Sequence, residues 1–111
     1  MPRNQEVALR CQIKAGGFSQ ERIAEVALAG GGKHTVLAPR HYCWTQDKRP
    51  LGIDEPAAGQ TINGWVAARR LGGRPGEPVV VTTPDGDVFE VSHEIVETRP
   101  AESEISPHVS V

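Results

Sequence analysis

The run His41-Tyr42-Cys43 holds side chains that could bind a metal ion. In an extended segment, residues 41 and 43 lie on one face, so an imidazole and a thiolate would point the same way. His34 or Cys11 from a neighbouring strand would add a further ligand, and zinc prefers nitrogen and sulfur ligands. The sequence lacks C-x-x-C and H-x-x-x-H spacings. We keep His34, His41 and Cys43 as a candidate zinc site, with a buried structural cysteine as the alternative.

The same cysteine could instead act as a nucleophile, with His41 or His93 as its base. A cysteine attacks as its thiolate, so such a site needs an adjacent base and a residue that orients the base. The sequence identifies no such third residue beside Cys43. A small buried hydrophobic residue is the simpler interpretation of this cysteine. We therefore predict no catalytic residues and expect a protein that is not an enzyme.

Basic and aromatic side chains could together bind single-stranded nucleic acid. Small β-barrels do so by combining a positively charged groove with aromatic rings on which bases stack. The candidate residues are Arg69, Arg70, Arg74, Trp44 and Trp65, with Lys48 and Arg49 nearby. Aromatic residues are only 5% of the chain and the net charge is −2. Nucleic acid is therefore the less favoured partner, since nucleic-acid-binding domains are usually basic overall.

Two other motifs are explained without chemistry. The run 30–33, Gly-Gly-Gly-Lys, resembles a phosphate-binding loop, but the G-x-x-x-x-G-K-[ST] spacing is missing and His34 stands where a hydroxyl is needed. Asp85 and Asp87 flank Gly86, so we assign both carboxylates to a turn. No carboxylate pair has a spacing that predicts acid–base catalysis.

These residues must be positioned by a small fold. A chain of 111 residues fits one compact domain, which we place at residues 1–97. Residues 85–111 carry one arginine against seven acids, whereas residues 1–84 carry eleven basic residues against seven acids. Residues 98–111 combine acids and prolines with little apolar content, and we expect them to form a flexible acidic tail.

The chain contains no segment that predicts export or membrane insertion. No apolar run approaches the roughly 20 residues that a membrane helix requires, and the first residues lack the apolar core of a signal peptide. We expect a cytoplasmic protein with no membrane partner. In that compartment Cys11 and Cys43 are expected to be buried and reduced.

The clearest structural pattern is a β-hairpin over residues 79–91, around which we expect the chain to be arranged. Its first arm is β-branched and its second arm alternates apolar and charged residues. The run 84–86, Pro-Asp-Gly, supplies the turn. This hairpin resembles the strand–turn–strand unit of SH3-like small barrels. The resemblance covers only the hairpin and implies no function.

Three further segments are predicted to be strands. Residues 6–14 alternate almost strictly, which places Val7, Leu9, Cys11 and Ile13 on the buried face. Segments 22–28 and 33–38 flank a glycine turn at hairpin distance, although a helix over 19–29 also fits. Phe18 is expected to lie beneath the turn after the first strand.

The middle of the chain is less clear. Residues 45–60 lack periodicity and contain prolines and glycines, which indicates a loop that is either functional or disordered. Segment 61–71 fits a helix or a strand. We favour a strand around Trp65 to Ala68, because a β-rich chain needs partners for its edges. That strand would point Trp65 and Ala67 inward, and Trp44 and Trp65 are expected core anchors.

A weak internal similarity completes the prediction. A strand, a turn, a second strand and a short polar step describe both 24–42 and 79–96, and aligning Gly32 with Gly86 sets Leu37 against Val91. Two such units suit a small barrel, because neither alone buries its apolar face. The predicted fold is mainly β, a small barrel or sandwich of short antiparallel hairpins with at most one short helix.

For function, we expect a non-enzymatic binding or assembly module. Its partner would be another protein or a second copy, contacting an exposed strand edge or the 45–60 loop. The alternatives are a nucleic-acid-binding module that uses the arginines, or a small metal or thiol site around His41 and Cys43. No cofactor is expected unless zinc binds at that site.

Overall fold

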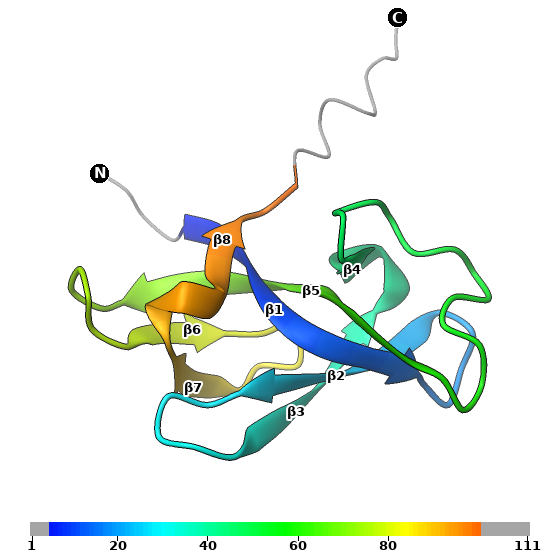
Figure 1. Ribbon diagram of the computed structural model, residues 1–111, viewed down its shortest axis with the longest axis horizontal. Helices are drawn as coiled ribbons and strands as arrows, with labels where there is room; N and C mark the ends of the chain where they lie inside the picture. The colour runs from blue at the N-terminus through cyan, green and yellow to red at the C-terminus, as the bar shows by residue number, and fades with distance from the viewer. Residues whose placement is uncertain (1–4, 101–111) are drawn as a thin grey trace, which may run out of the picture.

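The computed structural model describes residues 5–100, which form one antiparallel sheet that curls into a half-barrel (Figure 1). The strands are β1 (Gln5–Ala15), β2 (Glu21–Ala27), β3 (Lys33–Pro39), β4 (Cys43–Thr45), β5 (Thr61–Gly72), β6 (Val79–Thr82), β7 (Val88–Val91) and β8 (Val96–Thr98). Two 3-10 helices of three residues, η1 (Arg40–Tyr42) and η2 (His93–Ile95), precede β4 and β8. The predicted mainly β fold class is confirmed, and both ambiguous segments are strands.

The long strands β1 and β5 are the centre of this sheet. They pair over ten residue pairs, from Gln5 with Arg70 to Lys14 with Thr61. On the edge that faces away from β5, the first half of β1 pairs with β8 and its last residues pair with β2. On the edge that faces away from β1, the middle of β5 pairs with β4 and its last residues pair with β6. The hairpin predicted over 79–91 is present as β6–β7, but it lies at one end of the strand order. The expectation that the chain is arranged around it is therefore wrong.

The two halves of the chain repeat the same pattern of strand pairing. Adding 57 to the residue numbers of β1 and β2 gives their counterparts in β5 and β6, and the pairing follows this relation up to Arg70↔Val81. A register shift after Arg70 pairs Gly72 with Val80 instead of Val79. Adding 53 to those of β3, η1 and β4 gives their counterparts in β7, η2 and β8. Matching pairs are Gln12↔Glu25 with Arg69↔Thr82, Ala24↔Val36 with Val81↔Phe89, and Cys43↔Val66 with Val96↔Leu9.

This repetition is a pseudo-two-fold symmetry in which the halves interlock. Leu9 pairs with its own counterpart Val66, so the symmetry axis passes through the centre of the β1–β5 ladder. Each half gives its last short strand to the long strand of the other half, since β4 pairs with β5 and β8 pairs with β1. Neither half therefore completes its part of the sheet alone.

The turns that follow the long strands obey the same relation. Gly16 and Gly73 are counterparts, and an added Cβ would lie 2.6 Å from the Glu21 carbonyl oxygen or 2.8 Å from that of Pro78. Glu21 and Pro78 are themselves counterparts. Both turns thus need glycine for the same close backbone approach.

The internal similarity predicted from the sequence is real, but its alignment is one residue out of register for β3 with β7 and three residues out for β2 with β6. The counterpart of Leu37 is Glu90, and that of Ala38 is Val91. In the aligned segments, 5–27 with 62–84 and 33–47 with 86–100, only Gly16/Gly73 and Thr45/Thr98 are identical. The halves share backbone geometry without sharing sequence.

The main core lies on the concave face of the sheet. It contains the four residues predicted for β1, together with inward residues of β2 to β7 such as Val36, Val66 and Val81. A second cluster on the other face consists of Ala8, Trp44, Trp65 and Ala67. Both tryptophans are buried as predicted, but Trp65 and Ala67 do not face the main core. Residues 46–48 instead cover Trp65, whose Nε1 donates to the Gln46 carbonyl at 3.0 Å.

The ends of the sheet meet through individual contacts between the β2–β3 and β6–β7 hairpins. The Ala29 N–H donates to the Glu90 carbonyl at 3.0 Å, and the Leu37 N–H donates to Asp85 Oδ2 at 3.1 Å. His34 Nε2 lies 2.8 Å from Asp87 Oδ2, and these two residues are counterparts across the pseudo-two-fold axis. These contacts occupy part of both end strands, β3 and β7.

The Asp85 contact predicts a pH dependence of stability. Burial alone would raise the pKa of Asp85, but hydrogen bonds from the Thr83 hydroxyl and the Leu37 N–H lower it below its usual value. A carboxyl with a lowered native pKa stabilises the fold above the unfolded-state value of about 3.9, and this contribution is lost as the pH falls through the native pKa. We expect Asp85→Asn to lower the free energy of unfolding at neutral pH.

The measurement is urea unfolding of both proteins at neutral and acidic pH. The difference between wild type and Asp85→Asn should shrink as the pH is lowered, because the wild-type carboxyl is then protonated too. A difference that stays constant over this range would contradict the assignment.

Two predictions concern the membrane and the tail. Within residues 5–100 no helix is long and apolar enough to cross a membrane. Thr98 is the last residue of β8, and Arg99 donates to the Ala68 carbonyl at 2.9 Å, so both belong to the folded part. The rest of the predicted tail, 101–111, lies outside the described residues.

Candidate functional site

The residues predicted to bind zinc lie in different environments. His34 contacts Asp87 and packs against Phe89 in a tilted arrangement, with ring centroids 4.3 Å apart. His41 is exposed and its ring is tilted against that of Tyr42, whereas Cys43 is 1% exposed in the main core. Residues 5–100 contain no group of three or more His, Cys, Asp or Glu side chains that could hold a metal ion. The structure thus does not bring the three candidates together.

Both cysteines are buried and free, as predicted. Burial raises the pKa of Cys43 to about 12, although the nearby Arg22 charge acts in the opposite direction. Burial also raises the pKa of Cys11, and the charge of Cys43 adds to that effect. Thiols with such values stay protonated at neutral pH, which favours a packing role over nucleophilic chemistry.

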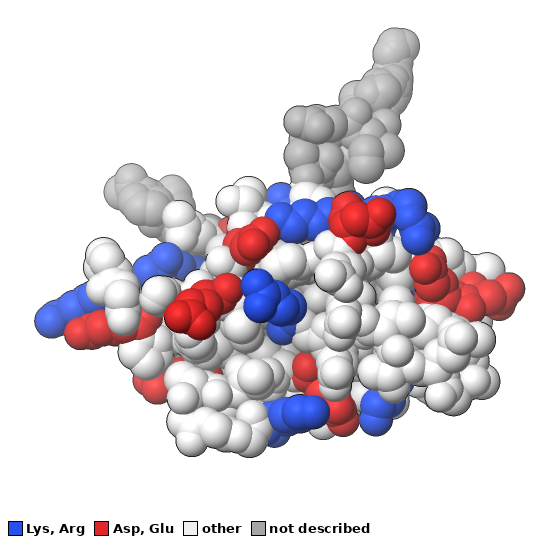
Figure 2. Space-filling model, viewed as in Figure 1, with Lys and Arg blue, Asp and Glu red and all other residues white. Residues whose placement is uncertain are grey.

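The arginine and tryptophan candidates do not form one surface. Arg69 and Arg70 are neighbours in β5 and so point to opposite faces of the sheet. Trp44 is 2% exposed and Trp65 is 6% exposed, so neither ring is free to stack on a base. Arg10 and Lys48 lie over the Trp65 ring, 5.8 and 5.0 Å from its centroid. Figure 2 shows basic and acidic side chains interleaved on one face of the molecule.

A better candidate is an apolar surface next to the C-terminal end of β1. Phe18 is 76% exposed, Leu37 is 47% exposed and Ile53 is 53% exposed. Phe18 lines two hollows, one of about 340 Å³ shared with Leu37 and one of about 400 Å³ shared with Ile53. We call these three residues and the two hollows the Phe18 surface. The expectation that Phe18 lies beneath the turn is wrong, because most of its side chain is exposed to solvent.

The turn that carries Phe18 is fixed by its own backbone. The Gly16 N–H donates to the Glu21 carbonyl at 3.1 Å, and the Glu21 N–H donates back to the Phe18 carbonyl at 3.0 Å. The Glu21 side chain accepts a further hydrogen bond from the Gly17 N–H at 3.2 Å. Phe18 is therefore presented by an ordered turn.

Arg22 joins this turn to the segment between β4 and β5, residues 46–60, which corresponds to the loop predicted over 45–60 and is called the 46–60 loop below. Its guanidinium donates at 2.8 Å to the Ser19 carbonyl in the turn and at 2.8 Å to the Ile53 carbonyl in the loop. Further bonds reach the carbonyls of Glu21, Gly52 and Glu55. The predicted loop is thus present, but it is held in place instead of disordered. Arg22 is 2% exposed, and it sets the spacing between Phe18 and Ile53.

The burial of Arg22 could have been predicted from the sequence, but the strand prediction did not include it. The inward positions of β2 are Arg22, Ala24 and Val26, so the alternation itself places one charged residue among the buried ones. A buried arginine must find acceptors, and the nearest irregular segment can supply carbonyls. Phe18 carried no comparable signal, because an apolar residue in a turn is equally compatible with burial.

Comparison with protein-family models, curated proteins and solved structures finds no match to this chain.

Proposed function

We propose that the protein is a non-enzymatic binding module whose partner is another protein, bound at the Phe18 surface. The observation that carries the proposal is Phe18 itself, an aromatic side chain 76% exposed on an ordered turn between two hollows. Aromatic residues are enriched at the centres of protein interfaces, where they fill pockets of the partner. Because the turn is already ordered, binding loses little conformational entropy.

The surroundings favour side-chain docking over addition of a strand. Both end strands of the sheet are partly occupied by the contacts between the two hairpins, which leaves less free edge for a partner strand. The Phe18 surface instead offers apolar side chains on three different segments. We further propose that the fold is of the SH3-like type and that the protein acts in the cytoplasm. Both are consistent with a binding role.

Site-specific photo-crosslinking in cells tests the proposal. The photoreactive residue p-benzoylphenylalanine replaces Phe18 in one variant and Val88 in the other. Val88 is a matched control because it is an apolar residue 60% exposed on β7. We expect a discrete adduct from position 18, identified by mass spectrometry and absent from position 88. Adding Leu37→Asp should suppress that adduct while the circular dichroism spectrum stays unchanged.

Two results bear differently on the partner. An adduct containing two copies of this chain would make the partner a second copy, as an assembly module requires. Labelling at position 18 that equals labelling at position 88, or that survives Leu37→Asp, would show that the Phe18 surface is not a binding site.

A further inference from the structure

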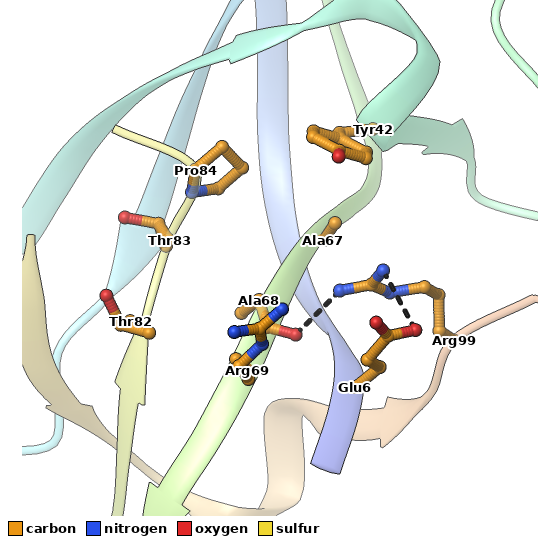
Figure 3. A pocket seen from close by; sticks show the side chains of 9 residues that line it. All are labelled: Glu6, Tyr42, Ala67, Ala68, Arg69, Thr82, Thr83, Pro84 and Arg99. Atoms are coloured by element: carbon orange, nitrogen blue, oxygen red, sulfur yellow. Dashed lines mark hydrogen bonds and ion pairs between the residues drawn. The ribbon is translucent and has the colours of Figure 1, made fainter. Parts of the chain in front are cut away.

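A third hollow lies on the convex face of the sheet, away from the Phe18 surface, and it shares no lining residue with the other two. It encloses about 350 Å³, which is within the range of small-ligand sites. Its lining includes Glu6, Arg69, Arg99, Tyr42 and Ala67 (Figure 3). We call it the Arg69 pocket.

The hollow exists because its floor is made of small side chains. Ala67 pairs with Ala8 across the central ladder, and the next pairs along the same face contain Trp44 and Trp65. Ala67 and Ala68 line the hollow, and Ala67 belongs with Ala8 to the second core cluster. A methyl group stands where a larger residue would fill the space between Tyr42 and the arginines.

Arg99 is held in place on one wall. Its guanidinium donates to the Ala68 carbonyl at 2.9 Å and to the Val7 carbonyl at 3.5 Å, and it lies 3.3 Å from a Glu6 carboxylate oxygen. The side chain is 20% exposed. Glu6 therefore neutralises Arg99 and fixes its orientation.

Arg69 supplies the positive charge of the pocket that Glu6 does not neutralise. It lies opposite Glu6 on β1 and opposite Thr82 on β6. Within residues 5–100 its exposed guanidinium makes no hydrogen bond or ion pair, and its cross-strand neighbour Glu6 pairs with Arg99. The charged lining residues are two arginines and one glutamate, so the pocket carries one net positive charge. Figure 3 shows the Arg99 guanidinium below Ala67, the Arg69 guanidinium at Ala68, and the Tyr42 ring on the other side of Ala67.

We propose that the Arg69 pocket binds a carboxylate group, with Arg69 as its main ligand. A guanidinium presents two parallel donors that match the two oxygens of a carboxylate. One net positive charge matches a monoanion better than a phosphate dianion. The alanine floor and the Tyr42 ring would contact the apolar part of the ligand.

Titration of ¹⁵N-labelled protein with benzoate, followed by NMR, tests this site. We expect chemical-shift changes at the amides of Ala67, Ala68 and Arg69. Benzamide, a neutral molecule of the same shape, should bind at least about tenfold more weakly, as expected for loss of a charge-assisted hydrogen bond. A short peptide with a free carboxyl terminus, compared with its amidated form, shows whether the carboxylate of a peptide is also accepted.

Arg69→Gln should lose binding of benzoate by about the same factor. Arg70→Gln is the matched control, because its neighbouring guanidinium lies on the other face and bonds to the Gly73 carbonyl at 2.8 Å. Equal binding of benzoate and benzamide, unchanged binding in Arg69→Gln, or no response to benzoate would overturn the proposal. Tighter binding of inorganic phosphate would overturn the choice of a carboxylate. None of these results concerns the Phe18 surface.

Discussion

Replacing Gly64 by alanine is expected to destabilise the protein by about 3 kcal/mol, in the range found for overpacked cores. Gly64 lies in β5 between Cys11 on β1 and Thr45 on β4. An added Cβ would lie 2.7 Å from Ile13 Cδ1 and would overlap the Trp44 carbonyl oxygen. The oxygen belongs to the backbone of the adjacent strand, so a side-chain rotation cannot relieve the overlap. β4 must move away from β5.

Gly72→Ala is the matched control for this substitution. Gly72 is on the same strand, its φ is not positive, and nothing lies within 4 Å of an added Cβ. Alanine there restricts the unfolded chain and should be neutral or stabilising by up to about 1 kcal/mol. Urea unfolding of both variants provides the comparison. Similar stability of the two variants would show that β4 is not packed against Gly64 as described.

Displacement of β4 would also reach the Arg69 pocket. Tyr42 lines that pocket and immediately precedes β4. Gly64→Ala is therefore expected to weaken benzoate binding as well as stability, whereas Gly72→Ala should leave binding unchanged.

The strands could be predicted from the sequence where one face of a segment is apolar. The alternation of β1 identified its inward residues, because side chains on a strand have a period of two. The same rule failed for Trp65, since both faces of β5 are buried in the middle of the strand. Periodicity cannot assign a face when neither face is polar.

The interlocked symmetry could not be predicted, because it depends on pairing between residues far apart in the chain. β8 pairs with β1 only after the whole chain has been placed, as in Leu9 with Val96. The two halves have different side chains at counterpart positions, such as Arg22 and Val79 or His34 and Asp87. The two halves share a pattern of strand pairing, and this pattern cannot be recognised from residue types.

The candidate sites, too, could be predicted only in part from the sequence. The sequence singled out His41, Cys43 and the tryptophans by residue type, but side chains of suitable chemistry can be buried or far apart. Arg69 was identified, yet its role depends on which arginine Glu6 neutralises. That choice follows from the β1–β8 pairing and from no local pattern.

Arg22 carries the other large expected effect. It is 2% exposed and donates to five backbone carbonyls, and no carboxylate within residues 5–100 pairs with it. Arg22→Met removes all five hydrogen bonds. The carbonyls of the 46–60 loop must then hydrogen-bond to water, which requires the loop to move away from the sheet. Since each hydrogen bond to a charged group is worth about 1.5–3 kcal/mol but such values are not additive, we expect a loss of about 3–5 kcal/mol.

The measurement separates a local effect from a global one. Urea unfolding gives the loss of stability, and hydrogen exchange reports the loop, where the Glu55 N–H that bonds to the Gly52 carbonyl at 3.1 Å should lose protection. Arg49→Met is the matched control, because its side chain is 58% exposed and its ion pair with Glu55 should contribute less than about 1 kcal/mol. Arg22→Lys should fall between the two, since one ammonium group cannot reach carbonyls on both the turn and the loop. A stable Arg22→Met protein with a protected loop would mean that apolar packing, and not this guanidinium, positions Ile53 beside Phe18.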